Sequence, residues 1–332
     1  MTFHISRRAL FAAGAAAASA AALPGGPAQA AAPMRNQLAP AWHRFKWGDF
    51  EATVISDGSL PLGKPQDSFV GPGADQIASM LTSEFLDPQA ATLEQNILIL
   101  NTGRQLLLFD TGMGDSMGAD SKMFGPTTGR MLQNMRAAGI EPSQIDMVIA
   151  THAHCDHVWG LVDAAGQRVF PNAQVAINEL DVKYWTDDAN KRGPAFMGPF
   201  IEGAKKNLSA YRDRMVMVRD GQEVVPGVVA LFTPGHTVGH TCYAITSQGR
   251  TMVNTGDLAH HQVLLLRSPL MEFSFDTDPK LSAQTRSRML DRLATDRHAV
   301  LSSHFPWPGR GHVRKEGSGY AWVSAPMNVT TL

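Results

Sequence analysis

The amino-acid sequence predicts an α+β fold in which two sheets are flanked by helices. Short apolar segments of strand character recur from residue 49 to residue 302, and helical patterns follow them at intervals in both halves. Gly and Pro account for 30 and 20 of the 332 residues, which indicates many loops between short elements. The apolar fraction of 44% can supply a large core, and no repeat or low-complexity linker interrupts residues 46–325, so we expect one domain there.

In the first half of this domain, apolar segments predict strands that end in turn signals. Asp57-Gly58 closes the first strand, and the Asn-Thr-Gly-Arg sequence at 101–104 joins two further strands as a hairpin. A periodic set of Met and Leu residues predicts a helix, and Gly139 suits the position just after its end. The predicted strands are 51–57, 96–100, 105–109 and 145–150, and the predicted helix is 127–138.

The second half of the domain alternates in the same way. Asp278 and Pro279 suit the N-cap and first position of a helix whose leucines and Met289 form an apolar face. The remaining predicted strands are 228–232, 241–246, 251–254, 263–266 and 298–302, and the remaining predicted helices are 178–185 and 199–211.

The first 30 residues resemble an export signal. A short basic segment contains Arg7-Arg8, an Ala-rich apolar run follows to residue 23, and Ala28-Gln29-Ala30 suits a cleavage site. The paired arginines are typical of the twin-arginine route. We therefore expect a signal peptide at 1–30, a leader at 31–45, and a periplasmic or secreted protein. No later run is apolar enough to cross a bilayer, so no membrane span is expected after signal removal.

Charge and cysteine content exclude other classes of protein. The formal net charge of −1 shows no basic excess, so a nucleic-acid partner is not expected. Two cysteines cannot build a disulfide-rich scaffold or a Cys-only zinc site. Cys242 is expected to be a buried strand residue. Cys155 lies within the motif described next, but its side chain alternates away from the candidate ligands, so it is not expected to bind metal.

The sequence His152-Ala153-His154-Cys155-Asp156-His157 directly follows the predicted strand 145–150. Imidazole suits zinc and similar divalent metals, and carboxylate adds a harder ligand. His152 and His154 are two residues apart, so an extended loop can direct both at one ion. Asp156 and His157 continue the turn and can face a second ion. The spacing therefore predicts a metal-binding loop at the end of a strand.

Three further candidate ligands each follow a predicted strand. His236 follows strand 228–232, Asp257 follows strand 251–254, and His304 follows strand 298–302. A single histidine is usually structural, but loops at strand ends converge on one edge in layered folds. We therefore expect these three side chains to complete the site.

In this order, the seven residues are similar to the ligand pattern of metallo-β-lactamase-fold hydrolases with binuclear sites. The similarity extends from about Asp49 to about Tyr320. Within that superfamily, several longer strings look like the methyl parathion hydrolase group. They are Gly48-Asp49-Phe50-Glu51, Ser56-Asp57-Gly58, Asp110-Thr111-Gly112, Phe124-Gly125-Pro126-Thr127, Phe170-Pro171-Asn172-Ala173, Gly235-His236-Thr237 and Gly309-Arg310-Gly311-His312-Val313-Arg314.

The resemblance implies an αβ/βα sandwich, with two mixed sheets and helices on the outer faces. It also implies two divalent metal ions per chain, with zinc as the expected metal. Asp257 and Asp156 would be the catalytic carboxylates, and Asp110 would orient a ligand histidine. The ligands of one ion would be His152, His154 and His236, those of the other Asp156, His157 and His304, with Asp257 and a water or hydroxide bridging the two.

The substrate pocket is expected to be aromatic. Phe124, Trp185 and Phe196 lie in loop-rich segments, and His260 follows Asp257 closely enough to line the site. The segment 113–123 departs from the resembling group and is expected to reshape the entrance. No cluster of Arg or Lys lies beside the motifs to bind a doubly charged phosphate. The expected substrate is therefore a small neutral ester, such as an organophosphate triester, an aryl ester or a lactone.

Other functions follow from the same residues. An N-acyl homoserine lactonase would use the same ligands, and a tyrosine near the lactone carbonyl would favour it; Tyr184, Tyr211 and Tyr243 are available. A β-lactamase is disfavoured by Asp257, and a glyoxalase-II-like thioesterase by the strand-like tail. A persulfide dioxygenase, which is a mononuclear iron oxidoreductase, would lack part of the second ligand set. In a metal-free binding module, the histidines and aspartates of the motif would have no function. The sequence is also compatible with a homodimer.

Overall fold

The computed structural model describes residue 34 and residues 38–327. Contacts divide the chain into Met1–Ala39 and Pro40–Leu332, and every element below belongs to the second unit. The predicted export signal at 1–30 lies outside the described residues. Within the described ranges, no helix combines the length and apolar character needed to cross a bilayer.

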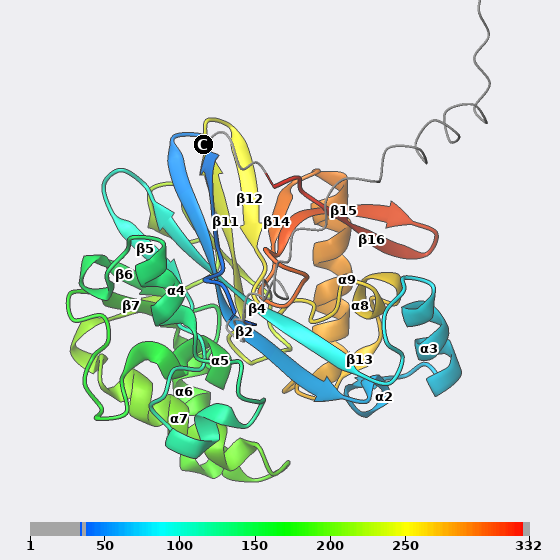
Figure 1. Cartoon of the computed structure of the whole chain (residues 1–332), viewed down its shortest axis with the longest axis horizontal. Helices are drawn as coiled ribbons and strands as arrows, with labels where there is room; N and C mark the ends of the chain where they lie inside the picture. Colours follow the sequence, from blue (N-terminus) through cyan, green and yellow to red (C-terminus); the bar gives the residue numbers. More distant parts are fainter. Residues whose placement is uncertain (1–33, 35–37, 328–332) are drawn as a thin grey trace, which may run out of the picture. The chain divides into compact units, whose positions relative to one another are not determined.

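Two mixed sheets form the centre of this unit (Figure 1). In the first, the order is β1-β2-β4-β5-β6-β7-β8, antiparallel up to β5 and parallel from β5 to β8. In the second, the order is β16-β15-β14-β12-β11-β10-β9, with one parallel pair, β12 and β14. The strands are β1 Trp42–Trp47, β2 Phe50–Gly63, β4 Ala91–Asn101, β5 Leu106–Phe109, β6 Met147–Ile149, β7 Gln174–Asn178, β8 Met215–Val218, β9 Glu223–Val225, β10 Val228–Phe232, β11 Thr241–Ser247, β12 Arg250–Asn254, β14 Ala299–Leu301, β15 Arg310–Glu316 and β16 Gly319–Ser324; β3 Phe69–Val70 pairs with β13 Glu272–Phe273.

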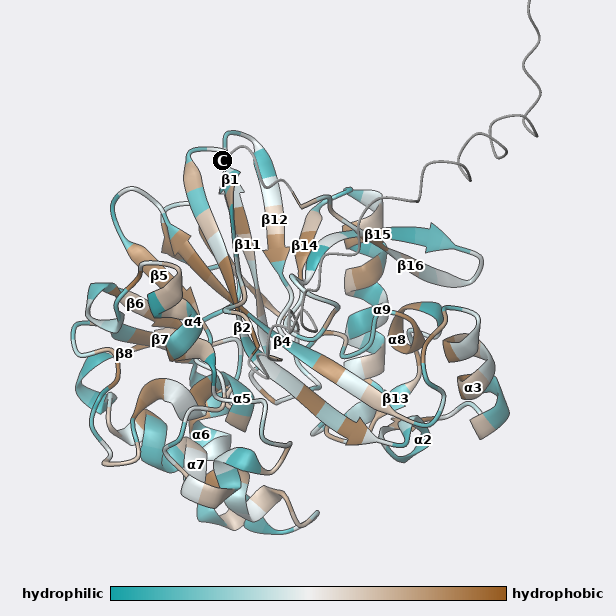
Figure 2. Ribbon diagram, viewed as in Figure 1, coloured by the Kyte–Doolittle hydropathy of each residue, from teal (hydrophilic) through white to brown (hydrophobic). Residues whose placement is uncertain are grey.

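The apolar residues sort into layers by the alternation of strand side chains. Along β4, Leu98 and Leu100 pack between the two sheets, whereas Ile97 and Ile99 face the helices outside the first sheet. A third cluster packs α8 and α9 against the outer face of the second sheet. This is the predicted αβ/βα sandwich (Figure 2). The helices are α2 Pro65–Ser68, α3 Ala74–Thr82, α4 Met131–Ala137, α5 Cys155–Val158, α6 Glu179–Trp185, α7 Met197–Ser209, α8 Leu264–Arg267 and α9 Pro279–Thr295.

The helix start predicted at Asp278-Pro279 is confirmed, since the Asp278 side chain accepts a hydrogen bond from the Leu281 backbone N–H at 3.0 Å. The strand predicted at 263–266 is wrong, because α8 occupies this segment. Its leucines are all buried, and a short run that is buried on every side shows no period that separates helix from strand. Strand β1 was not predicted, and it begins inside the segment expected to be a leader.

The antiparallel pair of β2 and β4 extends beyond the other strands of the first sheet. The register shifts between Ser56 and Gly58, and the paired strands continue toward α2 and α3 (Figure 1). Gly58 has φ +124°, and a Cβ there would collide with the carbonyl oxygen of Thr127. The bend at this position thus needs glycine. The bend directs the paired end of β2 and start of β4 past the ligand loops described next.

Candidate metal centre and its pocket

The histidine-rich loop leaves the first sheet at the end of β6. Thr151 is fixed to Asp110, whose carboxylate accepts hydrogen bonds from the Thr151 backbone N–H at 2.7 Å and from its hydroxyl at 3.0 Å. His154 lies on extended backbone, and α5 begins directly after it. Asp156 and His157 therefore lie in the first turn of a short helix.

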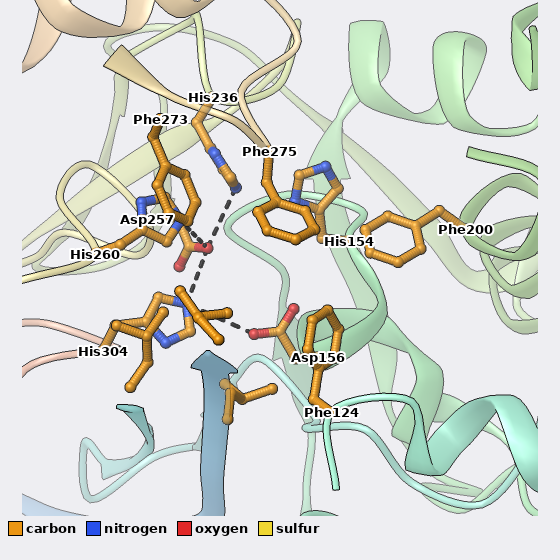
Figure 3. A pocket seen from close by; sticks show the side chains of 13 residues that line it. Phe124, His154, Asp156, Phe200, His236, Asp257, His260, Phe273, Phe275 and His304 are labelled. Atoms are coloured by element: carbon orange, nitrogen blue, oxygen red, sulfur yellow. Dashed lines mark hydrogen bonds and ion pairs between the residues drawn. The ribbon is translucent and has the colours of Figure 1, made fainter. Parts of the chain in front are cut away.

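The other three predicted ligands come from the second sheet. His236 lies between β10 and β11, Asp257 follows β12, and His304 follows β14. Because β12 and β14 are parallel neighbours, their following loops meet at one edge. All seven side chains are buried there. Figure 3 shows His236, Asp257 and His304 facing His154 and Asp156 across the site.

The ligand atoms form two clusters that share Asp257. One contains His152, His154, His236 and Asp257, and the other Asp156, His157, Asp257 and His304, with the ligand atoms of each within 4.8 Å of one another. Asp257 Oδ2 lies 3.2 Å from His236 Nε2 and 3.0 Å from His304 Nε2. This pairing into clusters is the one that the family resemblance implies.

Several of these buried atoms have no hydrogen-bond partner among the described residues. They are His154 Nε2, His157 Nε2 and Asp257 Oδ1. A buried polar atom without a partner is unfavourable, unless an ion or water completes it. The orphaned atoms all point into the shared centre, and their imidazole and carboxylate chemistry suits divalent metals. The residues therefore fit a binuclear metal site.

Partners on the far side of each ring orient the ligand histidines. His157 Nδ1 lies 2.9 Å from Asp110 Oδ2, as predicted for Asp110, and His236 Nδ1 lies 2.7 Å from Asp276 Oδ1. His304 Nδ1 donates to the Glu94 carbonyl at 2.8 Å. A proton held at Nδ1 leaves Nε2 free to bind metal. Asp276 was not predicted, because it is remote in sequence from every motif.

Asp181 joins the two ligand loops, and no motif in the sequence marks it. Its carboxylate accepts hydrogen bonds from the Ala153 N–H at 2.8 Å, the Thr237 hydroxyl at 2.9 Å and the Gly239 N–H at 2.5 Å. Ala153 lies between His152 and His154, and Thr237 follows His236. Burial raises the pKa of Asp181 to about 6 despite these hydrogen bonds. One α6 side chain thus sets the spacing of the first cluster.

Electrostatics keep the carboxylate of Asp257, which both clusters share, charged. Burial opposes its ionisation, but His157, His304 and His152 hold the pKa of Asp257 well below its ordinary value. Burial also opposes charge on His236, yet Asp257 and Asp276 raise its pKa to about 9. Burial and neighbouring histidines lower the pKa of His152. The carboxylates thus attract positive charge to a centre whose histidines can ligate.

An apolar pocket opens over these clusters (Figure 3). Its volume is about 40 Å³, and no Lys or Arg lines it. The Phe124 and Phe275 rings are 6.1 Å apart. The lining residues are Leu60, Leu62, Leu93, Phe124, Phe200, Phe273 and Phe275 together with His154, Asp156, His236, Asp257, His260 and His304.

Two of the four predicted pocket residues need correction. Phe124 and His260 line the pocket, but Trp185 and Phe196 do not. Trp185 is 1% exposed and packs edge-on against His154, with ring centroids 4.7 Å apart. Phe196 packs behind Phe275 at 5.0 Å. Both rings support residues that line the pocket. Their distance from the cavity is set by how α6 and α7 pack, which local composition does not reveal.

Segment 113–123, which departs from the sequence of the resembling group, leads directly to Phe124. The Asp57 carboxylate holds the backbone on both sides of this stretch. Asp57 accepts hydrogen bonds from the backbone N–H groups of Met113 at 2.9 Å, Gly129 at 3.1 Å and Met131 at 2.8 Å. These hydrogen bonds fix the backbone on both sides of Phe124. The expected effect of 113–123 on the entrance stays a prediction, because no residue of this segment is in the pocket lining.

None of the candidate tyrosines lines the pocket. The Tyr211 hydroxyl donates to the Leu161 carbonyl at 3.1 Å, and the Tyr243 hydroxyl donates to the Ala150 carbonyl at 3.2 Å. Tyr184 packs against Trp185. Cys155 and Cys242 are both buried and free, and neither belongs to a metal cluster.

The layered fold and its paired clusters define a metal-dependent hydrolase. A model of the Metallo-beta-lactamase superfamily matches residues 91–304, and the chain belongs to this superfamily. It is 24% identical over 220 residues to an N-acyl homoserine lactonase of Bacillus thuringiensis, covering 62% of this chain and 79% of the relative. The narrower resemblance to the methyl parathion hydrolase group stays a prediction.

Two solved structures extend the comparison. AidC, a dizinc quorum-quenching lactonase in complex with a product, N-hexnoyl-L-homoserine, is 27% identical with a TM-score of 0.79, over 86% of this chain and 97% of that one. Hydrolase AbOPH in the beta lactamase superfamily is 26% identical with a TM-score of 0.81, over 88% of this chain and 100% of that one.

Proposed function

We propose that this protein is a dizinc lactonase that opens amphipathic lactones such as N-acyl homoserine lactones. The observation that carries the proposal is an uncharged wall of Phe and Leu side chains directly over two clusters suited to metal. Such a pocket suits a neutral ring with an apolar chain. The lactonases among the relatives support the same activity.

Zinc suits the donor set, which is rich in histidine and completed by carboxylates. His152, His154 and His236 would hold one ion, and Asp156, His157 and His304 the other, with Asp257 shared. When bound, such a pair lowers the pKa of a water toward about 7 and polarises an ester carbonyl. A mononuclear iron enzyme would leave one cluster unused, which disfavours the persulfide dioxygenase.

The chain's own residues can manage the proton. In lactone hydrolysis the attacking water loses a proton, the ring C–O bond breaks, and the leaving oxygen gains a proton. Asp257 Oδ2 is placed to accept the proton that the water loses. His260 Nε2 lies 3.1 Å from this oxygen. His260 stacks on Phe273 at 3.9 Å and lines the pocket. His260 is thus placed to pass the proton to the leaving oxygen. The tyrosine near the lactone carbonyl that would favour this activity is not among the residues that line the pocket.

A substrate panel on zinc-loaded protein tests the proposal. The panel is hexanoyl- and decanoyl-homoserine lactone, an unsubstituted γ-lactone, an aryl acetate and a dialkyl aryl phosphotriester. We expect kcat/KM to be highest for the acyl lactones, and two zinc ions per chain by elemental analysis. A preference for the phosphotriester would replace the lactonase by the second candidate, an organophosphate triesterase, which the same uncharged aromatic pocket favours.

We also propose that the chain is exported by the twin-arginine route. Arg7 and Arg8 precede the apolar run of the predicted signal. Replacing both by Lys should leave unprocessed precursor in the cytoplasm. Mature protein outside the cytoplasm in that variant would contradict the proposed route.

A further inference from the structure

A second concave site lies at the opposite ends of the strands that lead to the metal ligands. It is lined by residues at the start of β12, the start of β14 and along β15, and its volume is about 550 Å³. β12 leads to Asp257 and β14 to His304, so a strand length, about 15 Å, separates this site from the metal centre. We call it the arginine groove: Arg250, Arg297, His298, Arg310 and His312, with Asp296.

The charge of the arginine groove is strongly one-sided. Within the described part of the chain, Arg250, Arg297 and Arg310 form no ion pair with any carboxylate. Asp296 is the lone acid in the lining, and it faces Arg292 at 3.6 Å and His298 at 3.8 Å. Burial and the neighbouring Arg250 lower the pKa of Arg310. Arg250 and Arg310 therefore lie close enough to repel each other.

Aromatic rings hold two of these arginines in place. The Arg250 guanidinium lies 4.4 Å from the ring centroid of Trp47, and that of Arg310 lies 4.2 Å from the centroid of Phe45. Arg310 Nη2 also donates to the Pro326 carbonyl at 3.3 Å. Both rings belong to β1. Guanidinium groups fixed on aromatic faces lose little freedom when a ligand binds.

The third arginine lies on unusual backbone. Arg297 has φ +55°, in the turn between α9 and β14. For a residue other than glycine this left-handed conformation is unfavourable. Glycine or asparagine would relieve the strain, yet an arginine that lines the groove stands there.

We propose that the arginine groove binds a compact, multiply charged anion that carries phosphate groups. Guanidinium groups match phosphate oxygens with paired N–H donors, and several unpaired arginines in one cavity suit a ligand with more than one charge. The groove is concave and local, so it suits a small ligand and not an extended polyanion. This ligand is distinct from the uncharged substrate of the pocket, so the inference stands apart from the proposed lactonase activity.

Calorimetric titration with inorganic pyrophosphate tests this, using acetate as the singly charged control. We expect pyrophosphate to bind and acetate not to bind. Arg297→Gln and Arg310→Gln should each weaken pyrophosphate at least about tenfold, because each removes a charged hydrogen-bond donor. Arg314→Gln is the matched control, since Arg314 is exposed on the same β15 strand but paired with Glu316 at 2.7 Å. Its affinity should be unchanged.

The arms also separate other sources of binding. Pyrophosphate affinity that is equal in all variants would place the anion at the metal centre and overturn the proposal. Arginine-dependent binding to phosphatidylglycerol vesicles without binding of pyrophosphate would assign the groove to a lipid surface and also overturn it. Lactone hydrolysis in the groove variants should match wild type, because none of these residues touches the pocket.

Discussion

The metal clusters and the pocket wall contact each other but are held in different ways. The ligands follow strand ends within the two sheets, and carboxylates such as Asp110, Asp181 and Asp276 fix their orientation from behind. The wall comes from elements that project beyond the sheets. The β2–β4 extension supplies the leucines, and the excursion tied down by Asp57 supplies Phe124. The chemistry is therefore built into the sheets, whereas substrate choice depends on additions to them.

The largest effect should follow from a change within the metal clusters. His236→Ala should remove one metal and lower kcat for all substrates at least about 100-fold, because hydroxide activation needs both ions. Elemental analysis and steady-state kinetics measure this. His298→Ala, remote from the centre, is the control. Two bound metals and a near-normal rate in His236→Ala would exclude this residue from the ligands.

Trp185 tests the boundary between the two regions. It is buried behind His154, so Trp185→Ala should lower the free energy of unfolding by about 3–5 kcal/mol and weaken metal binding. Short and long acyl lactones should be affected alike. Denaturant unfolding and zinc competition measure these effects. A rise in KM confined to long-chain substrates, with normal stability, would return Trp185 to the pocket wall.

Asp57 tests how the wall is held. Burial raises its pKa to about 6, against 3.8 as the ordinary value. Between these values the folded state binds the proton and the unfolded state does not, so stability falls as pH rises from about 4 to about 6. The total loss should be about 3 kcal/mol. Asp57→Asn lacks this titration.

As pH rises from about 4 to about 6, the wild type should therefore lose about 3 kcal/mol of unfolding free energy relative to Asp57→Asn. Denaturant titrations at several pH values measure it. A pH-independent difference would mean that Asp57 titrates normally in the folded protein.

The smallest effect should come from the wall itself. Phe124→Ala should raise KM for decanoyl-homoserine lactone about tenfold relative to an unsubstituted γ-lactone, because less apolar surface is buried. Metal content should stay the same. Met123→Ala, in the same segment but outside the pocket lining, is the control. Equal losses for both substrates in Phe124→Ala would mean that this ring does not contact the acyl chain.

Much of the fold and the seven-ligand cluster could be predicted from the sequence, because both depend on local patterns. Each of these patterns spans only a few residues. They are the strand periodicity, the Asp278-Pro279 helix start and the spacing from His152 to His157. Strand ends meet at a sheet edge whatever the packing elsewhere. The helix α8 was missed because a fully buried run has no periodicity to read.

Only the tertiary structure decided which side chains support the site and which face the substrate. Asp181 and Asp276 reach ligand loops that lie far away in sequence, so no local pattern marks them. Trp185 and Phe196 were predicted to line the pocket because they are aromatic and lie in loop-rich segments, but the packing of α6 and α7 places both behind the lining. The sequence by itself determined the chemistry of the centre, since residue type and spacing define a metal ligand. The wall needed the fold, because burial and direction belong to packing.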